Sequence, residues 1–235
     1  MKNQAAFSGE SGKSDGLKLI IGYYGLWVVL TYLGIVSAVI GIYFALGGNI
    51  GYAIICLMVC GLCDMFDGPL ARQFKRTVKE ESFGIQIDAL ADLVSFGVFP
   101  AVIGYAVSAH YLTDQTSPMM ILNIAAAAIF VLAALTRLAY FNVVEIELHN
   151  KKERRKYYEG MPVTFVAILV PLIYSICLNF GVPLSSVYSV MLLAFSVFFV
   201  IRVRIPKIRG RYLLIFILIG LPIIAYLIWS IGANI

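Results

Sequence analysis

Residues 50–72 read IGYAIICLMVCGLCDMFDGPLAR, an apolar run that ends in two aspartates, Asp64 and Asp67, and one arginine, Arg72. A run of about 20 apolar residues is long enough to cross the hydrocarbon core of a bilayer as a helix. A charged side chain inside such a run costs at least about 2.5–3.5 kcal/mol on insertion scales, so it indicates a functional site. This stretch therefore predicts a membrane fold with a polar site built into it.

The whole chain has the composition of an integral membrane protein. Of its 235 residues, 61% are hydrophobic and only 13% are charged, whereas an average soluble domain carries about 25% charged residues. The mean hydropathy is +0.90. A water-soluble core cannot take up this much apolar surface, which excludes a soluble enzyme, a disordered chain and a nucleic-acid-binding module. We expect no nucleic acid among the partners.

Seven segments are long and apolar enough to span a membrane. They cover residues 24–46, 50–68, 84–108, 119–143, 162–181, 184–203 and 212–233. We therefore expect an all-α integral membrane protein. Residues 1–16 form a polar cytoplasmic N-terminus in this scheme, and residues 17–235 form a single transmembrane domain that carries the site.

The basic residues occupy alternate connections between these segments. All 18 lysines and arginines except Arg137 precede the first segment or lie at the end of, or in the connections after, the second, fourth and sixth segments. The positive-inside rule places these connections and the N-terminus in the cytoplasm, and their charges suit anionic headgroups of membrane lipids. Because the N-terminus is short and polar and no targeting tail is visible, we expect a multi-pass protein of a prokaryotic plasma membrane.

Four aspartates form two pairs at one depth of the predicted bundle. Asp64 and Asp67 are three residues apart near the end of the second segment, and Asp88 and Asp92 are four apart near the start of the third. Each spacing places both carboxylates on one helix face. Four converging carboxylates repel one another unless cations intervene, and hard oxygen ligands select Mg²⁺, Mn²⁺ or Ca²⁺. The pairs predict a two-metal site of the kind that assists phosphoryl-type displacement.

Small residues and an arginine accompany the aspartates. Gly68 and Ala71 continue the face of the first pair, and Gly84 lies one turn before Asp88. Small side chains let a bulky ligand approach the backbone, and the fork of the Arg72 guanidinium suits phosphate oxygens. This set predicts a diphosphate-binding site at the cytoplasmic end of the bundle.

Together these positions resemble the signature of the CDP-alcohol phosphotransferases. The pattern Asp64-x-x-Asp67-Gly68-x-x-Ala71-Arg72, followed by Gly84-x-x-x-Asp88-x-x-x-Asp92, matches that signature at all eight fixed positions. The connection from Gln73 to Phe83 is longer than is usual in the family. The resemblance covers the first six segments and implies a six-helix catalytic core, to which the seventh C-terminal helix is an addition.

The resemblance also implies roles for the signature residues. Two divalent cations, Mg²⁺ or Mn²⁺, would be bound by Asp64, Asp67, Asp88 and Asp92, with Asp92 as a ligand or as the general base. The CDP group of a lipid donor would be bound by Asp64, Gly68, Ala71, Arg72 and Gly84. The implied reaction transfers the lipid-linked phosphate to an alcohol and releases CMP. A homodimer is implied by the resemblance alone.

Three further stretches resemble the phosphatidylserine synthase branch of the family. They are Ala89–Ala101, Arg137–Asn142 and Glu159–Pro162. We therefore expect CDP-diacylglycerol as the donor and L-serine as the acceptor, with phosphatidylserine and CMP as products. Arg137 is the sole basic residue away from the ends of a predicted span, so it is a candidate either for binding the serine carboxylate or for pairing with an aspartate. Ser95 and Asn142 are weaker candidates for binding the acceptor.

Other functions stay open at this point. The same chemistry could use glycerol phosphate or inositol phosphate as acceptor, or an archaeol-type donor. A prenyltransferase also combines Asp-rich helices, Mg²⁺ and a diphosphate, but it gives no role to the Gly-x-x-Ala-Arg element. An ion-coupled transporter is a more distant alternative, because its carboxylates are expected at the membrane midplane and no inverted repeat is visible here.

Overall fold

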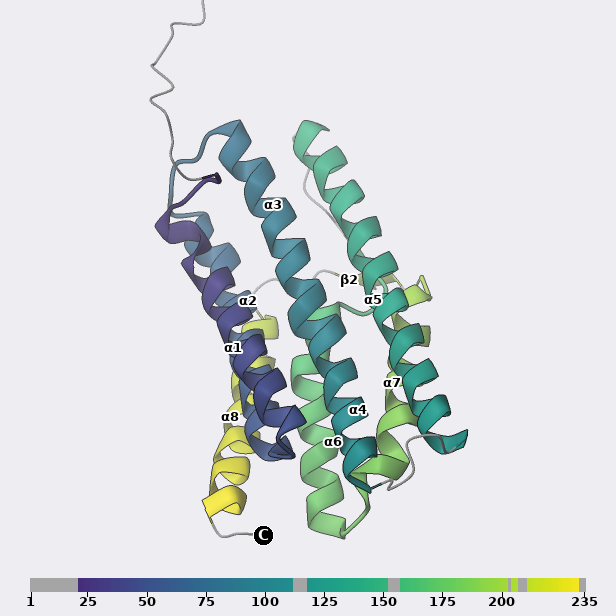
Figure 1. Ribbon diagram of the computed structural model, residues 1–235. Coiled ribbons are helices and arrows are strands. Elements are labelled where there is room, and N and C mark those ends of the chain that lie inside the picture. The colour runs from purple at the N-terminus through teal and green to yellow at the C-terminus, as the bar shows by residue number, and fades with distance from the viewer. Residues whose placement is uncertain (1–20, 112–117, 152–156, 203, 207–210, 233–235) are drawn as a thin grey trace, which may run out of the picture.

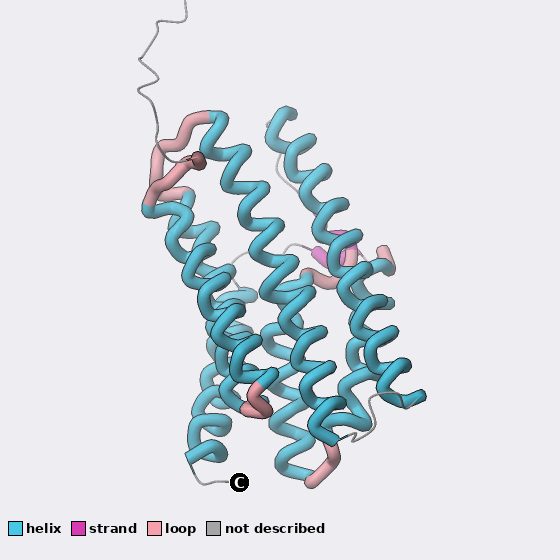
Figure 2. The backbone as a smooth tube through the Cα atoms, viewed as in Figure 1, coloured by secondary structure: helices cyan, strands magenta, loops and turns pink. Residues whose placement is uncertain are grey.

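The structure is a computed structural model that describes residues 21–111, 118–151, 157–202, 204–206 and 211–232. The predicted polar N-terminus, residues 1–16, lies outside the described residues. The described part is a bundle of long helices that run side by side, with a very small pair of strands at one edge (Figures 1 and 2).

All seven predicted segments are helical. The helices are α1 (Val29–Leu46), α2 (Ile50–Ala71), α3 (Val78–Asp92), α4 (Phe99–Tyr111), α5 (Pro118–Lys151), α6 (Val166–Phe180), α7 (Leu184–Val200) and α8 (Arg211–Gly232). Short 3-10 turns, Leu26–Val28 and Val163–Phe165, precede α1 and α6. A π-helical turn, Leu93–Val98, joins α3 and α4 into one continuous helix that corresponds to the third predicted segment.

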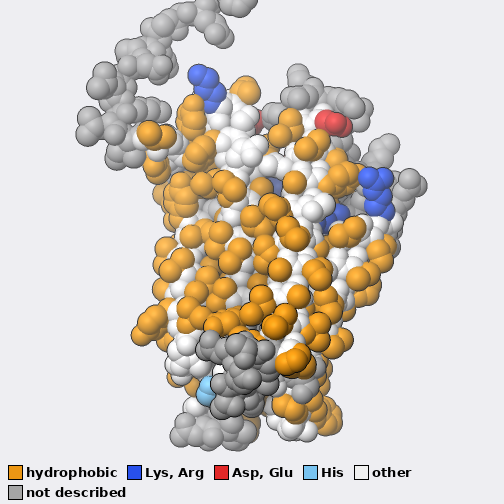
Figure 3. All heavy atoms as spheres, turned by 45° about the vertical axis from the view of Figure 1, so that its right-hand side comes forward, with side chains coloured by type: hydrophobic (Ala, Val, Ile, Leu, Met, Phe, Trp, Pro, Cys, Tyr) orange, Lys and Arg blue, Asp and Glu red, His pale blue; other side chains and the backbone are white. Residues whose placement is uncertain are grey.

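The surface of the bundle confirms a multi-pass membrane protein. Within the described residues, five helices are long and apolar enough to cross a membrane, namely Leu26–Leu46, Ile50–Ala71, Val78–His110, Pro118–Glu147 and Val163–Phe180. Val187–Val200 and Leu218–Gly232 are apolar but shorter. Hydrophobic side chains cover most of the face shown in Figure 3, and the Lys and Arg side chains visible there lie toward its upper end.

Small residues bring α1 and α2 close together. Gly34, Ala38, Gly41 and Ala45 lie on one face of α1, and all four are buried. The short distance between the helices lets Cys60 Sγ donate a hydrogen bond to the Gly34 carbonyl at 3.3 Å. Small side chains at such a seam permit close backbone approach in membranes. This packing fixes the position of α2, which carries the first aspartate pair.

A capping box fixes the start of α3. Thr77 Oγ1 accepts a hydrogen bond from the Glu80 N–H at 3.3 Å, and Glu80 Oε2 accepts one from the Thr77 N–H at 2.7 Å. These two bonds satisfy backbone donors that the first turn of a helix otherwise leaves unpaired. The box determines the residue at which α3 begins after the long connection, and thereby its register relative to α2.

The π-helical turn follows Asp92 directly and is followed by Pro100. Proline has no N–H, and its ring clashes with the carbonyl four residues earlier in an α-helix. The wider turn relieves this conflict, since its hydrogen bonds run between residues five apart. The Pro100 carbonyl accepts a hydrogen bond from the hydroxyl of Tyr188 on α7 at 3.0 Å.

A pair of short strands links two connections of the bundle. Strand β1 (Tyr157–Glu159) pairs antiparallel with β2 (Arg204–Pro206). The pairing ties the connection between α5 and α6 to the connection between α7 and α8. The hydropathy pattern of the sequence does not predict these strands, because each is only three residues long.

Two glycines of α1 test the packing of the α1–α2 seam. A Cβ atom at Gly41 would lie 2.8 Å from Cys56 Cβ and would overlap the Phe99 ring, whereas a Cβ at Gly34 would meet only Cys63 Cβ at 3.4 Å. Overpacking a core costs about 1–3 kcal/mol, while Gly→Ala in an unobstructed helix gains about 1 kcal/mol. We expect Gly41→Ala to lower the apparent melting temperature in detergent and Gly34→Ala to leave it unchanged or raise it. Equal melting temperatures for the two variants would contradict the close approach of Phe99 to α1.

Candidate active site

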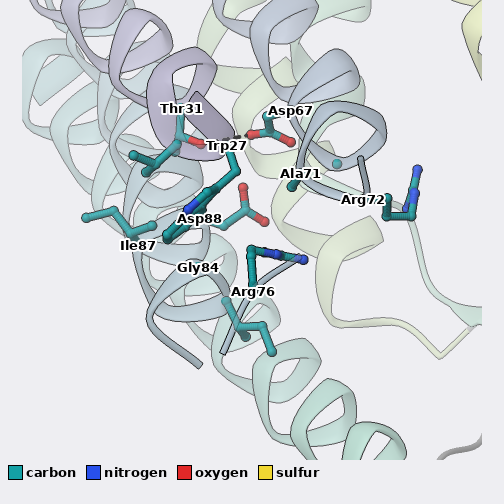
Figure 4. A pocket seen from close by; sticks show the side chains of 12 residues that line it. Trp27, Thr31, Asp67, Ala71, Arg72, Arg76, Gly84, Ile87 and Asp88 are labelled. Carbon is teal, nitrogen blue, oxygen red and sulfur yellow. Dashed lines mark hydrogen bonds between the residues drawn. The ribbon is translucent and has the colours of Figure 1, made fainter. Parts of the chain in front are cut away.

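The two aspartate pairs meet at the last turns of α2. One carboxylate oxygen from each of Asp64, Asp88 and Asp92 lies within 4.8 Å of the other two, which is close enough for one cation to contact all three. Asp67 lies within hydrogen-bonding reach of Asp88, and Figure 4 shows both carboxyl groups at the edge of the same cavity. The structure therefore brings together the four aspartates that the sequence spacing groups into two pairs.

Two threonines from other elements contact this cluster. Thr31 Oγ1, on α1, donates a hydrogen bond to Asp67 Oδ2 at 3.2 Å, as the dashed line in Figure 4 shows. Thr164, in the 3-10 turn before α6, lies beside Asp64. The cluster thus offers only oxygen ligands, which is the donor set that Mg²⁺ and Mn²⁺ prefer. The residues present fit a divalent metal site.

The first cavity lies between α2, α3 and the 3-10 turn before α1, and its volume is about 180 Å³ (Figure 4). Four of the residues expected to bind the diphosphate line it, namely Gly68, Ala71, Arg72 and Gly84. Asp67 and Asp88 also line it. Asp64, the fifth residue expected there, does not line this cavity and belongs to the cluster of three carboxylates instead.

The second cavity lies between α3, α5 and the turn before α6, and its volume is about 390 Å³. It shares Gly68, Arg72 and Asp88 with the first cavity and adds Asp92. Two of the residues expected to bind the acceptor, Arg137 and Asn142, also line it. The two cavities therefore meet at the aspartate cluster.

Arg137 is a buried cation with a fixed orientation. Its side chain is only 6% exposed, and its Nη2 donates a hydrogen bond to the Gly160 carbonyl at 3.2 Å. The guanidinium carbon lies 3.8 Å from the centroid of the Phe141 ring, an arrangement that favours a cation electrostatically. Gly160 directly follows β1, so the strand pairing positions the carbonyl that holds Arg137.

The other two acceptor candidates differ in their placement. Asn142 Nδ2 donates a hydrogen bond to Gln86 Oε1 at 3.2 Å, and Asn142 faces the second cavity. Ser95 lies in the π-helical turn, is 4% exposed and lines neither the first nor the second cavity.

Several residues that line the site are not singled out by the sequence pattern. Trp27 and Arg76 line the first cavity, and Thr164 and Glu145 line the second. Trp27 and Thr164 come from 3-10 turns whose position against α2 and α3 depends on tertiary packing. Arg76 is one of four basic residues in its connection, which the positive-inside pattern already accounts for.

Comparisons with known proteins identify a family for the chain. A family model described as CDP-alcohol phosphatidyltransferase matches residues 28–206. The CDP-diacylglycerol–serine O-phosphatidyltransferase of Saccharomyces cerevisiae is 36% identical over 134 residues, which are 55% of this chain and 44% of that protein. The chain therefore matches less than half the length of this yeast relative.

Two prokaryotic relatives match more of the chain. The archaetidylserine synthase of Methanothermobacter thermautotrophicus is 26% identical over 193 residues, which are 82% of this chain and 74% of that protein. The CDP-diacylglycerol–serine O-phosphatidyltransferase of Bacillus subtilis is 26% identical over 181 residues, 77% of this chain and 86% of that protein. No solved structure matches the chain.

Gly160 tests how Arg137 is held. Its φ is +75°, and a Cβ atom would lie 2.8 Å from the Ile201 carbonyl oxygen and 3.2 Å from Arg137 Nη1. Gly181 also has a positive φ, +64°, but a Cβ there meets nothing within 4 Å. The left-handed conformation alone costs alanine roughly 1–2 kcal/mol. We expect Gly160→Ala to lower the apparent melting temperature more than Gly181→Ala does, because only the first also displaces neighbouring atoms. Both variants carry the backbone strain of a positive φ, but only Gly160→Ala adds a steric clash. A larger fall in melting temperature for Gly181→Ala would contradict the close contacts of Gly160 with Ile201 and Arg137.

Proposed function

The chain belongs to the CDP-alcohol phosphatidyltransferase family, and from that membership we propose that it transfers the phosphatidyl group of CDP-diacylglycerol to the hydroxyl of L-serine, giving phosphatidylserine and CMP. The observation that carries the proposal is the meeting of two cavities at one aspartate cluster. One cavity is lined by the signature residues, and the other contains a buried arginine. The names of the relatives support serine as the acceptor.

We assign the metal site to the aspartates. Asp64, Asp67, Asp88 and Asp92 would hold two divalent cations, Mg²⁺ or Mn²⁺. When bound, such cations neutralise a diphosphate and stabilise the charge that develops on it during displacement. We assign the nucleotide to the first cavity, which Gly68, Ala71 and Gly84 line without bulky side chains, and the Arg72 guanidinium provides a fork for phosphate oxygens. The lipid chains of the donor then extend into the bilayer.

We assign the second cavity to the acceptor. The serine hydroxyl oxygen forms a bond to the phosphorus on the lipid side of the diphosphate. The bond from that phosphorus to the bridging oxygen breaks, and the bridging oxygen leaves with CMP. We assign Asp92 as the general base that takes the hydroxyl proton, and its position in the wall of this cavity supports the assignment. Holding donor and acceptor against one shared wall supplies the proximity that such a displacement needs.

The charges around the second cavity suit an amino acid. The Arg137 guanidinium is a group that can bind a carboxylate, and Glu145 lines the same cavity on the same helix. A site with charges of both signs favours a zwitterion such as serine. Glycerol phosphate and inositol phosphate carry anionic and hydroxyl groups only, so the Glu145 carboxylate would disfavour them.

An archaeol-type donor is a second candidate. The relative named archaetidylserine synthase matches 82% of this chain, a larger share than the yeast relative does. Both donors share the CDP headgroup, and the signature residues contact only that headgroup. The two donors therefore differ in the part of the molecule that lies among lipid chains.

We further propose that the site faces the cytoplasm of a prokaryotic cell. The basic connections flank the ends of α2, α5 and α7 and the start of α3, and the positive-inside rule assigns that end to the cytoplasm. The aspartate cluster lies in the last turns of α2, toward the same end. A homodimer in the plasma membrane remains the expectation from family resemblance.

The first test is CMP release by the purified protein in detergent or liposomes. We expect release from CDP-diacylglycerol only when both L-serine and Mg²⁺ or Mn²⁺ are present, and we expect a chelator to abolish it. Asp92→Asn should lower the rate by about 10²–10⁴-fold, the usual contribution of a general base. Parallel reactions with a CDP-archaeol donor decide between the two lipid classes.

Three outcomes would change the assignment. Release that responds to glycerol phosphate or inositol phosphate but not to serine would keep the family chemistry and discard the acceptor. Release with the archaeol-type donor alone would change the product to archaetidylserine. Transport of an ion without CMP release from either donor would restore the transporter alternative.

Arg137 provides the second test. Arg137→Gln removes the charge and retains a polar side chain, which is two atoms shorter than the one whose Nη2 contacts the Gly160 carbonyl. A hydrogen bond to a charged group contributes about 1.5–3 kcal/mol, so we expect kcat/KM for serine to fall by about 10–100-fold. The KM for CDP-diacylglycerol should stay nearly unchanged. An increase in the donor KM with an unchanged serine KM would show that Arg137 belongs to the donor site.

A further inference from the structure

One wall of the first cavity is built from residues outside the signature. Trp27 belongs to the 3-10 turn before α1, and Arg76 belongs to the long connection between α2 and α3. Both line the cavity together with Gly84 and Asp88. In Figure 4 they lie on the side of the cavity away from Arg72.

The Trp27 ring is fixed by aromatic neighbours. It is only 7% exposed and packs edge-on against Phe83, with ring centroids 6.3 Å apart and an interplanar angle of 86°. Phe83 in turn packs against Tyr23 at 5.6 Å. The guanidinium carbon of Arg76 lies 5.6 Å from the centroid of the Trp27 ring. A rigid indole face therefore supports the cation from one side.

Gly84 lets this wall reach the cavity. A Cβ atom at Gly84 would lie 3.2 Å from Arg76 Nη1 and 3.3 Å from Trp27 Cζ3. Both side chains therefore pass directly over the backbone of α3, one turn before Asp88. This contact gives the signature glycine a role that involves two residues the signature does not contain.

Arg76 has hydrogen-bonding capacity that its neighbours do not use. Its Nε is buried, and within the described part of the chain it has no hydrogen-bond partner. A buried donor without an acceptor costs free energy, so such a group indicates a missing partner. The cavity already contains the carboxylates that the metals would use, and an arginine fork matches the oxygens of a phosphate.

We propose that Arg76 binds the nucleotide-side phosphate of the CDP-linked donor, the phosphate that leaves as CMP, and that Trp27 is a positioning residue that holds the guanidinium over Gly84. The assignment rests on the proposed function, since it takes the first cavity as the nucleotide site. It adds a second cation to that site, opposite Arg72. It also gives the longer connection between Arg72 and Gly84 a binding role.

The test measures CMP binding by the purified full chain in detergent with Mn²⁺, using calorimetry. CMP contains the nucleotide-side phosphate and lacks the lipid-side phosphate, so it isolates the proposed contact. We expect Arg76→Gln to weaken CMP binding about 10-fold or more and to raise the KM for CDP-diacylglycerol, with the serine KM unchanged. The CMP affinity of Arg76→Lys should lie between those of the wild type and Arg76→Gln, because lysine keeps the charge and lacks the forked guanidinium. Lys75→Gln is the matched control, since Lys75 is exposed on the same connection, lies outside the cavity lining and carries the same charge.

A double-mutant cycle tests the role of Trp27. We expect Trp27→Leu to weaken CMP binding several-fold in the wild-type background and to have no further effect when Arg76 is already glutamine. A general loss of structure would instead weaken binding equally in both backgrounds. Trp27→Phe retains an aromatic face and should bind CMP more tightly than Trp27→Leu.

The outcomes separate this inference from the proposed function. The assignment of Arg76 is wrong if Arg76→Gln binds CMP as tightly as the wild type. It is also wrong if Arg76→Gln loses no more CMP affinity than the control Lys75→Gln does. In both cases the proposed function still stands. If the wild type binds no CMP in the presence of Mn²⁺ and releases none from the donors, the proposed function is wrong as well. Should Arg76→Gln fail to fold, the comparison of Arg76→Lys with Lys75→Gln decides the same question.

Discussion

Repulsion among four carboxylates at one end of an apolar bundle is the interaction on which the surrounding structure depends. Two like charges about 4.8 Å apart repel each other by roughly 3 kcal/mol at the effective dielectric constant typical of proteins. One oxygen from each of three aspartates lies within that distance of the other two, and Asp67 adds a fourth acid beside Asp88. Divalent cations would turn this repulsion into attraction, and hydrogen-bond donors beside the carboxylates also reduce it. Thr31 supplies one such donor, and Arg72 borders both cavities.

The elements around the cluster are positioned by helix packing, by a helix cap and by a strand pairing. The small-residue face of α1 sets the distance to α2, and the Thr77–Glu80 capping box sets the register of α3. The strand pairing of β1 with β2 places the Gly160 carbonyl beside Arg137. Each of these three interactions positions one side of the site, and none of them requires a polar residue in the middle of the membrane. Supports of this kind hold reacting groups in place without loosening the apolar bundle.

The part of the site that lies on α2 and α3 could be predicted from the sequence, because spacings of three and four residues determine which side chains share a helix face. Residues that reach the site from other elements could not be predicted in this way. Trp27 and Thr31 depend on how α1 crosses α2, and no local pattern encodes that crossing. Ser95 shows a different limit. It lies three residues after Asp92, so an α-helix would place both on one face, but the π-helical turn begins at Leu93 and rotates Ser95 into the core.

The same turn has a consequence for how the length of this chain can vary between relatives. In an α-helix each residue rotates the following chain by about 100° about the helix axis. Deleting one residue between Asp92 and Phe99 would therefore rotate α4 about its axis and turn its side chains away from their present contacts. Phe99, which lies against Gly41 on α1, would then point toward a different neighbour. The connection between Arg72 and Gly84 carries no such constraint, since a loop can absorb extra residues at little cost. Insertions and deletions among relatives should therefore accumulate before the capping box and be excluded from the six residues that follow the last aspartate.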